Sequence, residues 1–289
     1  MSLLHVIILA MVQGFAELLP VSSSAHVIVA EKLLGLDPAS PPMTLLLVML
    51  HTGTMFAVIV YFWRQWRDTY FESGAAFKKV AGLVILATLL TGIVGEGCIK
   101  IIEKTFFRNV PHAQIEDLFG HLELIAPALA AAGILILIAG IIEKRKPAGR
   151  FGESSELNAR RAGLIGLVQG LCLPFRGFSR SGATISTGML VGVAKSRAET
   201  FSFALAVVLT PPVVARETLR LLKAERISNA PHLAAAMAPS LLGAGFAFLA
   251  GLLALKWLTR WLESGRWYLF GIYCLFAAGV VAALHRAGY

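Results

Sequence analysis

Long apolar segments alternate with short charged connectors along most of the chain. Since about 20 apolar residues cross the hydrocarbon core of a bilayer as a helix, six of these segments are predicted to be membrane spans. They cover residues 45–63, 80–102, 122–142, 200–215, 233–255 and 267–284. The fourth is short and contains Pro211-Pro212, which lack backbone donors, so we expect this helix to be broken or kinked there.

Two further apolar regions, residues 3–34 and 162–193, are interrupted around Pro20 and Pro174. Each contains Val-Gln-Gly, then Leu-Pro, then a serine-rich segment, in the same order. Paired interrupted segments in corresponding halves are typical of inverted repeats with a binding site near the midplane. The pattern predicts an all-α integral membrane protein of about six transmembrane helices plus two re-entrant broken helical hairpins in an inverted repeat.

Composition fits this prediction: only 15% of the residues are charged, and the mean hydropathy is +0.73. We expect one membrane domain over residues 1–289, with repeat halves of about 1–143 and 160–289 joined by a basic cytoplasmic loop, 144–159. The net charge of +9 lies largely in such connectors, as the positive-inside rule predicts, and does not indicate a nucleic-acid partner. A basic stretch at 216–226 falls on the opposite side and does not follow this rule.

Three ionisable residues, Glu17, His26 and Arg180, stand inside the interrupted apolar segments. Such residues are unfavourable in a membrane and usually face a cavity, so they are candidate site residues. Gln13 lies four residues before Glu17, which places both on one helical face, and Ser23 lies three before His26 in the same way.

The serine-rich segments 22–24 and 179–182 each stand where a second short helix begins. Free backbone N–H groups at a helix start bind anions, and two such starts facing each other would cradle a diphosphate. Arg180 adds a guanidinium suited to phosphate oxygens. The pattern therefore indicates a multiply anionic ligand.

Hydrolysis of such a ligand needs a nucleophile, a proton acceptor and charge neutralisation, and Ser23, His26 and Arg180 are our candidates. Glu17 and Gln13 offer hard oxygen ligands for Mg²⁺ or Ca²⁺.

Structural alternatives remain open for each of these residues. Glu17 and Arg180 also fit a buried ion pair between the halves, His26 a hydrogen bond to a nearby carbonyl, and the serines simple helix caps. His51, in the second span, is interpreted as structural.

Two other phosphatase chemistries fail on spacing. The cysteine-dependent pattern Cys-x5-Arg meets Phe178 six residues after Cys172, and the pattern Ser-Arg-x5-His meets Ser186 in place of histidine.

Together these motifs resemble those of the bacterial undecaprenyl-diphosphatases, also called bacitracin-resistance phosphatases. The first motif is Gln-Gly-Phe-Ala-Glu followed by Pro-Val-Ser-Ser-Ser-Ala-His at 13–26, and the second is Arg-Gly-Phe-Ser-Arg-Ser-Gly-Ala-Thr at 176–184. The resemblance extends over most of the chain and assigns catalytic roles to Glu17, Ser23, His26 and Arg180. The substrate-binding candidates within the motifs are Ser22, Ser24, Arg176, Gly177, Ser179, Ser181, Gly182 and Thr184.

The resemblance implies a periplasm-facing site in the bacterial inner membrane, dependence on a divalent metal, and recycling of the carrier lipid of peptidoglycan synthesis. Three positions depart from the family pattern: Arg176 replaces a usual proline, His51 a glutamine and Ala25 a glycine. None removes a catalytic group.

The preferred hypothesis is a metal-dependent polyprenyl diphosphate phosphatase. A transporter that moves polyprenyl phosphate across the bilayer is the alternative, because midplane half-helices also build secondary transporters. Runs of small residues, such as 128–132 and 243–245, permit close helix packing within one chain or in a possible homodimer.

Overall fold

A computed structural model describes residues 2–37, 40–106, 121–145, 156–228 and 232–288. These residues form ten helices and no strand, which confirms the all-α expectation. In chain order they are α1 (Leu3–Leu18), α2 (Ser23–Leu33), α3 (Pro41–Thr69), α4 (Gly74–Phe106), α5 (Leu122–Arg145), α6 (Ala159–Leu171), α7 (Arg180–Leu190), α8 (Lys195–Ser228), α9 (His232–Glu263) and α10 (Tyr268–Arg286).

Six helices, α3, α4, α5, α8, α9 and α10, are long and apolar enough to cross a membrane, as the sequence predicted. Their outward faces carry large apolar side chains: Phe276 is 71% exposed, Ile93 69% and Ile101 67%. An exposed apolar surface of this kind is favourable in lipid and unfavourable in water. The chain is therefore a multi-pass membrane protein.

The expected break in the fourth span is wrong. α8 continues for 34 residues through Pro211 and Pro212, and the basic stretch 216–226 is part of this helix and not a loop. A proline removes its own backbone donor, and membrane helices tolerate this because neighbouring groups and local adjustments satisfy the freed carbonyls. Residues 107–120 and the linker residues 146–155 lie outside the described residues.

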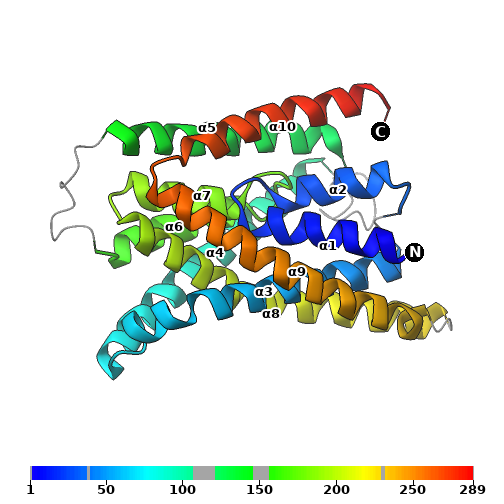
Figure 1. Ribbon diagram of the computed structural model, residues 1–289, viewed down its shortest axis with the longest axis horizontal. Coiled ribbons are helices and arrows are strands. Elements are labelled where there is room, and N and C mark those ends of the chain that lie inside the picture. Colours follow the sequence, from blue (N-terminus) through cyan, green and yellow to red (C-terminus); the bar gives the residue numbers. More distant parts are fainter. Residues whose placement is uncertain (1, 38–39, 107–120, 146–155, 229–231, 289) are drawn as a thin grey trace.

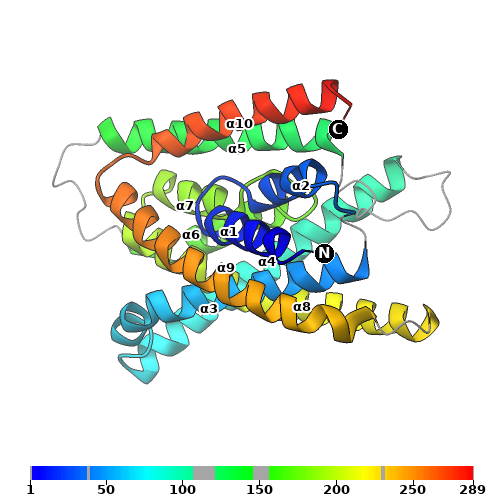
Figure 2. The same cartoon turned by 45° about the vertical axis from the view of Figure 1, so that its right-hand side comes forward.

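Both interrupted apolar regions are pairs of short helices, as predicted (Figure 1). α1 and α2 are separated by a break that contains Pro20, and α6 and α7 by a break that contains Pro174. α1 starts at the end of the molecule where the N-terminus lies, whereas α6 starts at the opposite end, so the two pairs enter from opposite directions (Figures 1 and 2). Re-entry into the membrane and the inverted repeat stay predictions.

Several helices pack closely against one another at glycines. A Cβ atom at Gly14 of α1 would lie 2.8 Å from the Ala247 carbonyl oxygen of α9, and one at Gly271 of α10 would lie 2.6 Å from the Leu137 nitrogen of α5. α9 thus packs behind α1, and α10 lies directly on α5. Both contacts need a residue without a side chain, because a Cβ at that distance from backbone overlaps it.

Candidate active site

The Glu17 carboxylate stands at the centre of the predicted site. Its Oε1 atom lies 2.5 Å from Arg180 Nη2, and its Oε2 atom accepts a hydrogen bond from the Ser23 hydroxyl at 2.5 Å. Gln13 Nε2 donates to the same Oε2 at 3.2 Å. The structure therefore brings together four of the predicted residues, from α1, α2 and α7. The Glu17 side chain is only 13% exposed, so the ion pair is largely shielded from solvent.

Local sequence explains why these groups meet. α1 ends at Leu18 because Pro20 disfavours a helical conformation in the residue before it, and Leu19 is extended with ψ of 152°. Ser22 then has a positive φ of 70°, which turns the chain into α2 directly below Glu17. Few residues other than glycine adopt this conformation, and such strain often occurs at functional sites.

Each break contacts the second short helix of the other pair. The Gly177 N–H donates to Ser24 Oγ at 3.2 Å, and the Ser181 hydroxyl donates to the Leu19 carbonyl at 3.3 Å. Gly177 has φ of 98°, and a Cβ there would lie 2.6 Å from the Ile125 carbonyl oxygen, so this position requires glycine. These contacts fix the start of α7, and with it Arg180, against the end of α1.

The serines differ in their roles. Ser179 caps α7, because its Oγ accepts from the Gly182 N–H at 3.2 Å, as predicted. Ser22 stands at the N-cap of α2 without a side-chain cap bond, and its hydroxyl lies 3.2 Å from that of Ser24. The first turn of α2 therefore lacks the expected serine cap, because Ser23 and Ser24 bind Glu17 and Gly177 instead.

His26 lies apart from the Glu17 cluster, although it follows Ser23 by one turn. Its Nδ1 atom is 2.8 Å from the Ser22 carbonyl oxygen, as in the structural alternative, and its Nε2 atom is 2.7 Å from the hydroxyl of Tyr273 on α10. The two rings also stack, with centroids 5.7 Å apart. Sequence reasoning did not find Tyr273, because a tyrosine in a span has no distinguishing pattern.

His51 of α3, which the sequence analysis interpreted as structural, lies beside the candidate site. Its Nε2 atom lies 3.6 Å from Glu17 Oε2, while its Nδ1 atom lies 2.8 Å from the Leu47 carbonyl oxygen. Both ring nitrogens of His51 therefore face oxygen atoms. An ionisable residue inside a span was the signal for it.

Two predicted substrate-binding residues, Arg176 and Thr184, differ in burial. Thr184 is fully buried; its hydroxyl donates to the Arg180 carbonyl at 2.8 Å and lies 2.5 Å from Ser202 Oγ. It ties α7 to α8 and so supports Arg180 from behind. Arg176 is exposed in the α6–α7 break, and its contact with phosphate stays a prediction.

Little space remains beside Glu17 and Arg180. A hollow of about 10 Å³ is lined there by side chains of α1, α3, α7 and α8, among them Thr54, Ala206 and Thr210. A single water molecule needs a cavity of about this size. The hollow beside the Glu17–Arg180 ion pair therefore has no room for a group larger than water.

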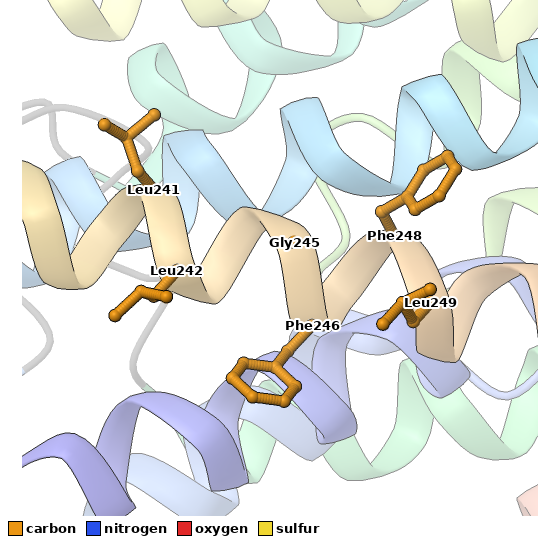
Figure 3. A pocket seen from close by; sticks show the side chains of 6 residues that line it. All are labelled: Leu241, Leu242, Gly245, Phe246, Phe248 and Leu249. Carbon is orange, nitrogen blue, oxygen red and sulfur yellow. The ribbon is translucent and has the colours of Figure 1, made fainter.

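A larger hollow, of about 560 Å³, lies on α9 and has no polar lining residue (Figure 3). Its residues are Leu241, Leu242, Gly245, Phe246, Phe248 and Leu249. With no charge or hydrogen-bonding side chain, it is unsuited to phosphate. A Cβ at Gly243 would meet side chains of α3, whereas a Cβ at Gly245 would meet nothing within 4 Å. The possible homodimer stays untested.

The fold and the site together define a class: a multi-pass helical membrane protein with an arginine, a carboxylate and a serine hydroxyl gathered between two broken helix pairs. Comparison with known proteins gives the family. Residues 6–281 match the family described as bacitracin resistance protein BacA, and this chain belongs to that family.

Full-length relatives agree with this assignment. The chain is 57% identical to Undecaprenyl-diphosphatase 2 of Acinetobacter baylyi, with 98% of both chains covered. It is 34% identical to Undecaprenyl-diphosphatase 1 of Burkholderia pseudomallei, covering 96% of this chain and 95% of the relative. It is 32% identical to Undecaprenyl-diphosphatase of Caldicellulosiruptor bescii, covering 99% and 98%.

Proposed function

We propose that this protein hydrolyses undecaprenyl diphosphate to undecaprenyl phosphate and inorganic phosphate in the bacterial inner membrane, and so recycles the carrier lipid and confers bacitracin resistance. The observation that carries the proposal is the Glu17 carboxylate, which binds Ser23 of one broken pair and Arg180 of the other at 2.5 Å each. The names of the full-length relatives support the same reaction.

The substrate replaces the internal ion pair. Its anionic diphosphate competes with Glu17 for Arg180 and for the backbone N–H groups at the starts of α2 and α7. Arg180 is 23% exposed and Glu17 13%, so both partners lie close to a surface from which a headgroup arrives. The polyprenyl tail stays in the surrounding lipid.

Ser23 is the proposed nucleophile. Its Oγ atom attacks the terminal phosphorus while its proton passes to Glu17, to which it already donates. The bond from that phosphorus to the bridging oxygen breaks, and undecaprenyl phosphate leaves with the bonding electrons. Water then attacks the phosphoserine, and its proton is taken up at His26. The bond from phosphorus to Ser23 Oγ breaks, Glu17 returns its proton to that oxygen, and inorganic phosphate leaves. Arg180 stabilises the phosphoryl charge in both steps.

A divalent metal, Mg²⁺ or Ca²⁺, fits this site only together with substrate. Among the residues that the structure describes, no group of three or more His, Cys, Asp or Glu side chains is suited to hold a metal ion. Mg²⁺ is often held by one carboxylate plus substrate phosphates, and the oxygens of Glu17 and Gln13 are a donor set of that kind. When bound, the metal would neutralise phosphate charge.

The site is proposed to open to the periplasm. The ends of α3, α5 and α9 that carry basic residues lie at one end of the molecule, opposite both termini (Figure 1), and such ends are expected in the cytoplasm. α1 then descends from the periplasmic side to Glu17. A C-terminal alkaline phosphatase fusion is expected to be active and a C-terminal green fluorescent protein fusion dark; the reverse pattern would place the termini in the cytoplasm.

The decisive experiment is phosphate release from undecaprenyl diphosphate by the detergent-purified protein, with Mg²⁺, with Ca²⁺ and with chelator. Metal-dependent release supports the proposal. A folded protein that releases no phosphate but moves labelled polyprenyl phosphate across vesicle membranes would instead favour the transporter alternative, which the relatives' names do not support.

A further inference from the structure

The tautomer of His26 follows from its two partners. The Ser22 carbonyl oxygen accepts hydrogen bonds only, so the 2.8 Å contact places a proton on Nδ1 of His26. In the neutral ring Nε2 then has a lone pair, which accepts from the Tyr273 hydroxyl at 2.7 Å. The two contacts together hold the nitrogen that has no proton towards α10.

Tyr273 also fixes the orientation of the His26 ring. The two rings are nearly parallel, with an interplanar angle of 13°. The next residue, Cys274, donates from its thiol to the Pro20 carbonyl at 3.3 Å, so two consecutive residues of α10 contact the first broken pair. At the N-cap of α10, the Trp267 indole N–H donates to Ser186 of α7 at 2.9 Å.

α10 is a rigid support for these contacts. It lies on α5 at the Gly271 contact, where a Cβ would lie 2.6 Å from the Leu137 nitrogen. Residues held by a rigid helix position a neighbouring group more accurately than residues on loops do. Tyr273 itself is 43% exposed and therefore is not a core packing residue.

We propose that Tyr273 is a positioning residue for His26: through its hydroxyl and its ring it holds the imidazole in the tautomer with an unprotonated Nε2, and this nitrogen takes up a proton during hydrolysis once the Tyr273 hydroxyl turns away from it. This inference rests on the proposed function. It gives α10 a direct part in aligning His26, although α10 carries none of the sequence motifs. It also explains why the His26 ring is turned away from Ser23, whose proton already passes to Glu17.

The test is a double-mutant cycle in the full-length protein, with Tyr273→Phe, His26→Ala and their combination. Phenylalanine keeps the ring and removes the hydroxyl. Tyr273→Phe is expected to lower kcat about tenfold, the lower range for groups that orient a metal-binding histidine through its second ring nitrogen, with little change in KM. In the His26→Ala background it is expected to have no further effect, because the two residues act as a unit. Tyr268→Phe, on the same helix, is the control and keeps wild-type activity.

Two results would overturn the inference: wild-type kcat for Tyr273→Phe, or an equal fractional loss in both backgrounds, which would mean that Tyr273 acts without His26. Nitrogen NMR of histidine-labelled wild-type protein adds a test that needs no variant. His26 is expected to show a proton on Nδ1 and none on Nε2, and the opposite tautomer contradicts the proposal. A wild-type protein without phosphatase activity would instead refute the proposed function, while leaving the NMR result meaningful.

Discussion

Arg180, the first residue of α7, and Glu17, near the end of α1, join the two broken helix pairs through an ion pair of 2.5 Å. The two residues are 163 positions apart in the sequence, yet their contact lies at the centre of the candidate site. This ion pair compensates two buried charges, and under the proposed function it is also the contact that the substrate and its metal ion replace.

Replacing Arg180 separates these two functions. Arg180→Lys keeps the positive charge but loses the paired donors that match phosphate oxygens, and Arg180→Ala loses both. We expect a fall in kcat/KM of about 10² to 10³ for alanine, as for loss of one donor that stabilises transition-state charge, and a smaller fall for lysine. Phosphate release is the measurement. Arg64→Ala, whose side chain is 90% exposed, is the control; a wild-type rate for Arg180→Ala would remove Arg180 from the reaction.

Ser23 is tested by its own substitutions. Ser23→Ala removes the attacking oxygen, so no phosphoserine forms, and release is expected to fall at least 10³-fold, because loss of a nucleophile lowers kcat by as much as about 10⁶. Ser73→Ala, at the start of α4, leaves activity unchanged. Brief incubation of wild-type protein with substrate labelled in the terminal phosphate is expected to label Ser23 transiently. Label on His26 in its place would reverse the roles of these two residues.

Substitution of Gly177 tests the contact between the two broken helix pairs. Gly177→Ala places a Cβ 2.6 Å from the Ile125 carbonyl oxygen at φ of 98°, where an L-residue is strained. We expect destabilisation of about 2 kcal/mol or more, seen as a lower Tm, together with reduced activity because the start of α7 shifts. Gly279→Ala on α10, with open space around it, is the matched control and keeps both. Equal Tm values for the two variants would mean that the break at Gly177 moves freely.

Much of this arrangement was predictable from the sequence, and the reasons differ by element. The six spans follow from hydropathy, and the two broken pairs follow from Pro20 and Pro174 within apolar segments. The Gln13–Glu17 contact follows from helical spacing. The Glu17–Arg180 contact was open to two interpretations, because an intramembrane ion pair and a ligand site have the same sequence signal.

Other features depend on tertiary structure and had no local signal. Helical spacing places Ser23 and His26 on one face, but the positive φ of Ser22 and the position of α10 send their side chains to Glu17 and Tyr273. The uninterrupted α8 was missed because proline preferences do not include the packing of neighbouring helices, which keeps a helix continuous through a proline.

Removal of metal tests whether Glu17 binds a metal ion only together with the substrate or holds a structural metal. In the ligand-free protein both carboxylate oxygens are occupied by Arg180, Ser23 and Gln13, so we expect chelator to leave the Tm nearly unchanged while it abolishes phosphate release. Excess Mg²⁺ or Ca²⁺ then restores activity. This combination distinguishes a metal that arrives with the diphosphate from a structural metal, whose loss lowers stability.

Glu17→Gln extends the same test. The amide still accepts from Ser23 but has no charge, so Arg180 is left without its anionic partner and metal affinity falls. We expect phosphate release to be lost at all metal concentrations, and binding of a non-hydrolysable diphosphate lipid without metal to become tighter, because the anion no longer competes with a carboxylate for Arg180. Gln13→Glu, which adds a carboxylate beside Glu17, is expected to shift the metal requirement to lower concentration and to weaken metal-free binding. If Glu17→Gln instead weakened lipid binding in chelator, Glu17 would hold the substrate directly, and the exchange of an internal ion pair for a metal and a diphosphate would be the wrong description of this site.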